Sequence, residues 1–231
     1  MTETLFDIAA LVIPLIIAIV FHEVAHGWTA RALGDPTAAN LGRLTLNPIK
    51  HVDPFGTIIL PGMLKLAGMP VFGWAKPVPV IKGRLRNPRR DMMIVAAAGP
   101  GSNLVMALIG AVLLGLMVRG ITADGAEQGM ATMFLVQNLV NFILLNVFLA
   151  LFNLLPIPPF DGGHIVEGLL PRHMAIKYAG LHNYALLIMI LLLVVVPWVF
   201  PSLNIVGWLV LPPVEWLNGH YMAIVQAVAG R

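Results

Sequence analysis

Two histidines and a glutamate interrupt an apolar segment near the N-terminus. The run from Leu5 to Ala30 is almost entirely apolar apart from His22, Glu23 and His26. On a helix, residues four apart project from one face, about 6 Å apart along the axis. Two imidazoles at that spacing suit one tetrahedral zinc ion, and Glu23 lies where a base could take a proton from metal-bound water. The alternative is a helix that buries two hydrogen-bonded histidines.

Composition places these three residues in a membrane. Of 231 residues, 58% are hydrophobic and 11% charged, and the mean hydropathy is +0.87. A soluble domain carries about 25% charged residues. We therefore predict an all-α polytopic membrane protein with a single membrane-embedded domain, residues 1–231. A charged residue at mid-bilayer costs roughly 2.5 kcal/mol or more, which favours a bound metal ion over an isolated polar cluster.

The hydrophobic pattern predicts a bundle of about five transmembrane helices. The expected spans are residues 5–30, 92–118, 130–155, 184–200 and 203–227. The first is interpreted as a retained span rather than a signal peptide, because Glu3 and Asp7 make its start acidic. The last is the weakest, because it contains Pro212, Pro213 and Glu215.

The region between the first two spans, residues 31–91, differs in character. It holds ten of the fourteen Lys and Arg residues and many prolines, with short apolar runs that cannot span. We expect re-entrant or interfacial elements here, with short β-strands as an alternative. The positive-inside rule makes this region cytoplasmic and puts the N-terminus outside. Topology thus explains the basic residues, so we expect the lipid bilayer and no nucleic acid as a partner.

A third metal ligand must come from elsewhere in the chain. Catalytic zinc usually has three protein ligands and a water. The sequence has no cysteine, which leaves His, Asp or Glu. Asp161 follows the third expected span, whose end returns to the same membrane face as His22 and His26. The alternative for Asp161, which precedes Gly162, is a turn residue that bonds to its own backbone.

These motifs resemble those of the site-2 protease family of intramembrane zinc metalloproteases. The resemblance rests on His-Glu-Val-Ala-His at 22–26 and on Asn-Leu-Leu-Pro-Ile-Pro-Pro-Phe-Asp-Gly-Gly at 153–163. The segments 44–48, 72–79 and 98–103 are similar to those of its compact bacterial branch, which lacks a PDZ domain. Such membership implies an integral protein of the bacterial inner membrane, with its active site toward the cytoplasm.

The resemblance also implies roles for individual residues. His22, His26 and Asp161 would bind one Zn²⁺ per chain, and Glu23 would act as the general base. Asn153 would help to hold the substrate backbone. The substrate would be a transmembrane protein that is cut within or near its membrane segment. A helical substrate must unwind to be cut, and the stretch Gly73 to Ile81 is our candidate for a clamp that receives it. The alternative for this stretch is an interfacial loop anchored by Trp74.

Two other functions remain open from the sequence. A metal-ion transporter could use the three proposed ligands and Glu23 as a permeation site, although we find no internal repeat. A catalytically silent membrane scaffold would need none of them. Two further histidines have alternative interpretations: His51 as a metal-site residue or an interfacial loop residue, and His164 as a gating or metal-binding residue or a turn residue in water.

Overall fold

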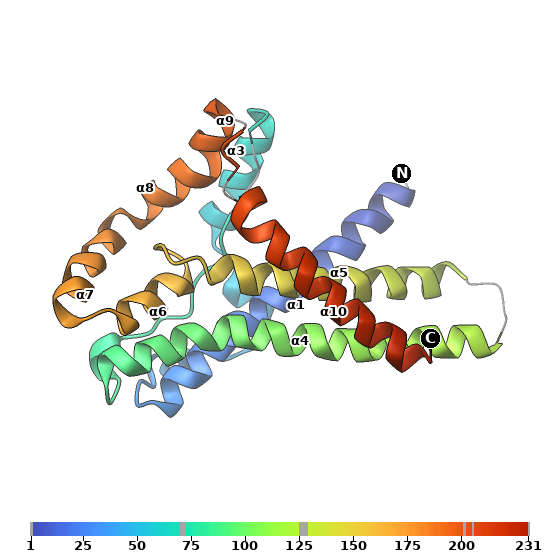
Figure 1. Ribbon diagram of the computed structural model, residues 1–231, viewed down its shortest axis with the longest axis horizontal. Helices are drawn as coiled ribbons and strands as arrows, with labels where there is room; N and C mark the ends of the chain where they lie inside the picture. The colour runs from blue at the N-terminus through green and yellow to red at the C-terminus, as the bar shows by residue number, and fades with distance from the viewer. Residues whose placement is uncertain (1, 70–72, 125–128, 201, 205, 231) are drawn as a thin grey trace.

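Long apolar helices make up most of the described chain. The computed structural model describes residues 2–69, 73–124, 129–200, 202–204 and 206–230 (Figure 1). Four helical stretches are long and apolar enough to cross a bilayer, and they are Leu5–Ala32, Pro88–Thr122, Met130–Asn153 and Arg172–Val199. The predicted all-α polytopic fold is therefore confirmed.

A bundle of four helices forms the core. Helices α1 (Thr2–Ala32), α4 (Pro88–Asp124) and α5 (Met130–Asn153) pack against one another, and α10 (Leu211–Ala229) crosses α4 and α5 (Figure 1). Ala107 and Ala111 of α4 are fully buried at this crossing, beside Ile143 and Val147 of α5. Small side chains in membrane helices let neighbouring backbones approach closely, and van der Waals packing then holds them.

The C-terminal part departs from the expected boundaries. The fourth apolar stretch begins twelve residues before position 184, since α7 (Arg172–Ala179), η4 (Gly180–Tyr184), α8 (Ala185–Ile190), η5 (Leu191–Val195) and α9 (Val196–Val199) follow one another. Residues 203–227 contain η6 (Val206–Val210) and most of α10. This segment is not among the four described stretches that are apolar and long enough to span, so a fifth span stays a prediction.

The region between α1 and α4 is built from short helices and extended backbone. It contains α2 (Thr37–Asn40), η1 (Pro48–His51), η2 (Pro54–Ile59), α3 (Leu60–Leu66) and η3 (Lys82–Arg84). Among the residues that the structure describes, none forms a β-strand, so short strands are not found here; residues 70–72 lie outside that set. Residues 73–81 are extended instead, and Pro77 and Pro79 lack the N–H that a ladder needs.

A sharp return at the end of α5 positions helix α6 (Asp161–Leu169). A Cβ on Gly162 would lie 2.2 Å from the Leu154 carbonyl oxygen and 2.4 Å from that of Leu155. Only glycine permits this approach between the start of α6 and the end of α5. Helix α6 also packs against α4. The Asp-Gly-Gly sequence therefore turns Asp161 back toward the bundle.

The position of α10 predicts the effect of enlarging Gly115 in α4. A Cβ there would lie 2.7 Å from the Val228 Cβ and 2.8 Å from the Val225 carbonyl oxygen. We expect Gly115→Ala to destabilise the protein by about 1–3 kcal/mol through overpacking. Gly101→Ala is the matched control in the same helix, because nothing lies within 4 Å of its Cβ. Thermal unfolding in detergent would measure both; equal unfolding temperatures would contradict the docking of α10 on α4.

Candidate metal centre

Three side chains from two distant segments meet at the face where α1 approaches α6. The Nε2 atoms of His22 and His26 lie 3.0 Å apart. Asp161 Oδ2 lies 3.1 Å from Nε2 of His22, and Oδ1 lies 3.3 Å from Nε2 of His26. Both histidines are buried, and 16% of the Asp161 side chain is exposed. The structure thus brings together the three residues that the sequence singled out as ligands.

The other ring nitrogens fix which way each imidazole points. His26 Nδ1 lies 2.7 Å from the Val95 carbonyl oxygen, and His22 Nδ1 lies 2.6 Å from Asn103 Oδ1. Both partners are acceptors, so each Nδ1 carries the proton and donates it. The tautomer that remains has a lone pair on each Nε2, directed at the partner histidine and Asp161.

A chain of amides holds Asn103 in the required orientation. Asn103 Nδ2 donates to Asn146 Oδ1 at 2.8 Å and to the Ala18 carbonyl oxygen at 3.2 Å. Asn146 Nδ2 in turn donates to the Phe142 carbonyl oxygen at 2.8 Å. Each amide is thereby fixed with its oxygen toward the next donor, ending at His22 Nδ1. Asn103 and Asn146 are fully buried, so this network links α1, α4 and α5 beneath the histidines.

The absence of a side chain at Gly99 makes room for both rings. A Cβ on this residue would lie 2.4 Å from His26 Nε2 and 2.6 Å from His22 Cε1. At this position α4 contacts the imidazoles themselves. The identity of this residue is therefore tied to the geometry of the histidine pair.

The arrangement fits a bound cation. Zn–N distances of about 2.0 Å in a tetrahedral site put neighbouring ligand atoms roughly 3.3 Å apart, close to the three separations given above. Lone pairs that face one another repel unless a cation lies between them. Asp161 Oδ2 is also buried without a hydrogen-bond partner.

Glu23 lies between the two histidines in sequence and contacts a third segment. Its Oε2 accepts a hydrogen bond of 2.7 Å from the N–H of Val78, in the extended stretch 73–81. Asp35 holds the same stretch by accepting from the N–H of Ile81 at 2.6 Å. Burial by itself would raise the pKa of Asp35. Hydrogen bonds from Thr37 and Ile81 together outweigh this effect, so the pKa lies below its usual value. The extended segment therefore runs alongside α1 next to Glu23.

The remaining predicted positions have simpler surroundings. Asn153 Nδ2 donates to the Leu149 carbonyl oxygen, one turn back in α5, at 2.9 Å, so its role toward a substrate stays a prediction. His51 is buried, and its Nε2 lies 2.9 Å from the Thr45 carbonyl oxygen. Its backbone carbonyl accepts from the N–H of Lys76 at 2.8 Å. His51 therefore holds the 73–81 segment in place and is not part of the described metal cluster.

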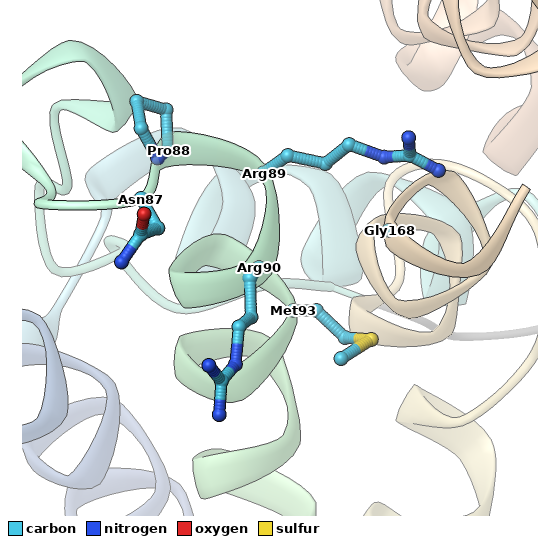
Figure 2. Close-up of a pocket in the computed structure, with 6 residues that line it drawn as sticks. All are labelled: Asn87, Pro88, Arg89, Arg90, Met93 and Gly168. Carbon is cyan, nitrogen blue, oxygen red and sulfur yellow. The ribbon is translucent and has the colours of Figure 1, made fainter. Parts of the chain in front are cut away.

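A separate cavity of about 510 Å³ lies between the start of α4 and α6 (Figure 2). Its lining residues are Asn87, Pro88, Arg89, Arg90, Met93 and Gly168. Figure 2 shows the Arg89 side chain extending toward α6, whereas the Arg90 side chain extends away from α6. The cavity has no histidine or carboxylate in its lining, so the candidate chemistry lies in the histidine cluster instead.

Sequence reasoning missed two groups around the site. The Val95 carbonyl that orients His26 is a backbone atom, and no side-chain pattern indicates it. In a second cluster, of His164, Glu167 and His182, the sequence indicated metal binding as one alternative for His164 but missed the other two, because Glu167 and His182 lie on separate short elements. The His-x-x-Glu spacing at 164–167, which puts both side chains on one helix face, was the available signal.

Comparisons with known proteins agree with this geometry. Residues 10–141 and 120–196 match Peptidase family M50. The chain is 45% identical over 185 residues to "Putative zinc metalloprotease YwhC" of Bacillus subtilis (strain 168), covering 80% of each chain. It is 30% identical over 190 residues to "Putative zinc metalloprotease Rip2" of Mycolicibacterium smegmatis, covering 82% of this chain and 66% of the relative.

A third relative extends the match along the chain. "Putative zinc metalloprotease Rip2" of Mycobacterium tuberculosis (strain H37Rv) is 29% identical over 222 residues, covering 94% of this chain and 77% of the relative. No solved structure matches the chain. Because the family match covers well over half of the residues and the first relative is 45% identical, the chain belongs to peptidase family M50, the site-2 protease family.

Proposed function

We propose that this protein is an intramembrane zinc metalloprotease that cuts peptide bonds within or near the transmembrane segments of membrane-anchored proteins. The observation that carries the proposal is the convergence of His22, His26 and Asp161 on one point, with Glu23 in the same helical turn as the histidines. Membership of a peptidase family, and relatives named as zinc metalloproteases, support the coarser assignment to zinc metalloproteases. The four apolar helical stretches support action inside the bilayer.

The proposed chemistry assigns a role to each residue. His22, His26 and Asp161 would hold one Zn²⁺. When bound, zinc acidifies a coordinated water and polarises the scissile carbonyl. Glu23 would serve as the general base, taking a proton from the attacking water and returning it to the leaving amine. The Nδ1–H donors of both histidines keep Nε2 available as a ligand, and their acceptors raise the basicity of the rings.

The 73–81 segment is our proposed receiving edge for an unwound substrate. In an extended chain, alternate residues direct their backbone groups to opposite sides. The N–H groups of Lys76 and Val78 are directed to His51 and Glu23. The alternate positions, Pro77 and Pro79, have no N–H to donate. The Pro77 carbonyl oxygen already accepts from Arg43 at 3.4 Å. The outer edge would thus receive a substrate mainly through other carbonyl oxygens such as that of Pro79, while Asn153 would supply a donor.

We propose the same orientation and location that the charge distribution predicts. The basic region 31–91 and the start of α6 would face the cytoplasm of a bacterial cell, and the N-terminus would lie outside the inner membrane. Water for hydrolysis would then reach the site from the cytoplasm by a short path. A transmembrane protein substrate and the surrounding lipid are the expected partners.

Two other functions make different demands on Glu23. A metal-ion transporter would use Glu23 as part of a permeation path, so replacing it would alter ion flux. A scaffold would keep its full activity without any charged residue in α1. The hydrogen bond from Val78 to Glu23 favours the protease, because it joins the proposed base to the segment that is proposed to receive the substrate.

Replacing Glu23 by glutamine tests the proposed base. We expect Glu23→Gln to lower cleavage of a membrane-anchored substrate at least a hundredfold, since general acid–base catalysis contributes about 10²–10⁴ in rate. Zinc content should stay unchanged, because the three ligands remain. Cleavage can be measured in proteoliposomes and zinc by elemental analysis of the same samples. Undiminished cleavage would contradict the base assignment, and zinc flux through the wild-type protein that this variant alters would favour a transporter.

Replacing Gly99 by alanine tests the geometry of the ligand set. The new Cβ would displace both imidazoles, so we expect zinc affinity to fall about 10–100-fold, as when outer-shell partners of a metal site are lost. Gly101→Ala, two residues along the same helix, adds its Cβ in open space and should bind zinc as the wild type does. Competition with a zinc-chelating dye would give both affinities. Equal affinities would mean that the histidines do not hold zinc in the described arrangement.

A further inference from the structure

A second group of potential ligands lies one turn further along α6. His164 Nδ1 and His182 Nε2 each lie 3.6 Å from Oε2 of Glu167. His164 and Glu167 belong to α6, whereas His182 belongs to η4, at the beginning of the fourth apolar stretch. None of the three is used by the proposed hydrolysis. Three ligand atoms within reach of one ion are what a metal site requires.

One ring nitrogen of each histidine in this cluster lacks a hydrogen-bond partner. His164 Nδ1 and His182 Nε2 are buried, and neither has a hydrogen-bond partner. The two imidazole rings are stacked, with centroids 4.4 Å apart and planes 16° from parallel. Buried polar atoms are normally satisfied, so two adjacent ring nitrogens without partners need an explanation. A metal ion would satisfy both at once.

Glu167 is held in the orientation that a ligand needs. Lys82 of η3 pairs with its Oε1, which leaves Oε2 facing the two histidines. Carboxylates that bind metals are commonly fixed in this way by a hydrogen-bond donor on the other oxygen. Lys82 is 41% exposed, so solvent screens its repulsion of a nearby cation. Only 11% of the Glu167 side chain is exposed, so its carboxylate lies mostly inside the cluster.

We propose that His164, Glu167 and His182 form a second metal site, which binds a divalent transition-metal ion such as Zn²⁺. Two imidazoles and one carboxylate suit a first-row transition metal, whereas Mg²⁺ and Ca²⁺ prefer oxygen ligands alone. Distances of 3.6 Å are a few tenths of an ångström longer than the roughly 3.3 Å between ligands of a tetrahedral zinc ion. Modest ring rotations out of the stacked arrangement close this gap.

Binding at this second site would connect segments that also form the first site. Helix α6 supplies Asp161 to the first cluster and His164 and Glu167 to the second. Lys82 directly follows the extended segment whose Val78 contacts Glu23. An ion held by His182 would thus fix α6 to the start of the fourth apolar stretch. The inference concerns the second cluster alone and does not depend on the proposed protease activity.

Zinc stoichiometry tests the proposal directly. Metal-free protein in detergent would be dialysed against buffered Zn²⁺ and analysed for zinc per chain. We expect two zinc ions in the wild type and one in His182→Gln. His173→Gln, which replaces an exposed histidine of α7, is the matched control and should keep two. One zinc ion in both the wild type and His182→Gln would overturn the second site.

A variant of the first site, His26→Gln, allows the second site to be measured alone. His26→Gln should retain one zinc ion, held by the second cluster, and zinc should raise its unfolding temperature because it binds only the folded state. Adding His164→Gln to that background should abolish both the bound zinc and the rise in unfolding temperature. Zinc that persists in the double variant would overturn the proposal. A wild type with one zinc ion, lost in His182→Gln and kept in His26→Gln, would support the second site and contradict the first.

Discussion

The mutual repulsion of three sets of lone pairs is the constraint on which this structure depends. When both rings are neutral, His22 and His26 each direct an unprotonated Nε2 at the other and at the Asp161 carboxylate, within 3.0–3.3 Å. Such an arrangement is unstable in a low-dielectric interior unless a cation lies between the ligands. The surrounding protein maintains it through the buried amides of Asn103 and Asn146 and the Val95 carbonyl. Binding of a divalent cation turns that repulsion into attraction.

Packing around the ligands follows from the same constraint. Gly99 lets α4 approach the imidazoles, and Gly162 lets α6 fold back onto the end of α5. Neither glycine has a side chain that takes part in the reaction. A Cβ at either position would displace a ligand residue from the site. Glu23 and Asp35 then bind the backbone of the extended segment alongside α1. The helices, the ligands and the proposed substrate edge are therefore parts of one connected arrangement.

The sequence predicted the parts of this site that depend on side-chain type and helical spacing. His22 and His26 were identified from their i, i+4 spacing, and Asp161 from its position after the third span and from family resemblance. Asn103 and Asn146 join α4 to α5 by a hydrogen bond between their side chains. The Val95 carbonyl could not be predicted, because every residue has one. Glu167 and His182 escaped notice because only the fold brings α6 and η4 together.

Two boundaries show where local pattern was a poor guide. Residues 172–183 contain Arg172 and Lys177, so they were not expected to continue the fourth span, but the helical stretch begins at Arg172. The region 31–91 offered short apolar runs that allowed strands, whereas its prolines favour short helices and extended backbone.

Zinc K-edge absorption spectroscopy of protein loaded with one equivalent of zinc tests the central claim most directly. The account predicts only nitrogen and oxygen neighbours at about 2.0 Å, two of them imidazoles, and a changed spectrum in Asp161→Ala; an identical spectrum in that variant would contradict it.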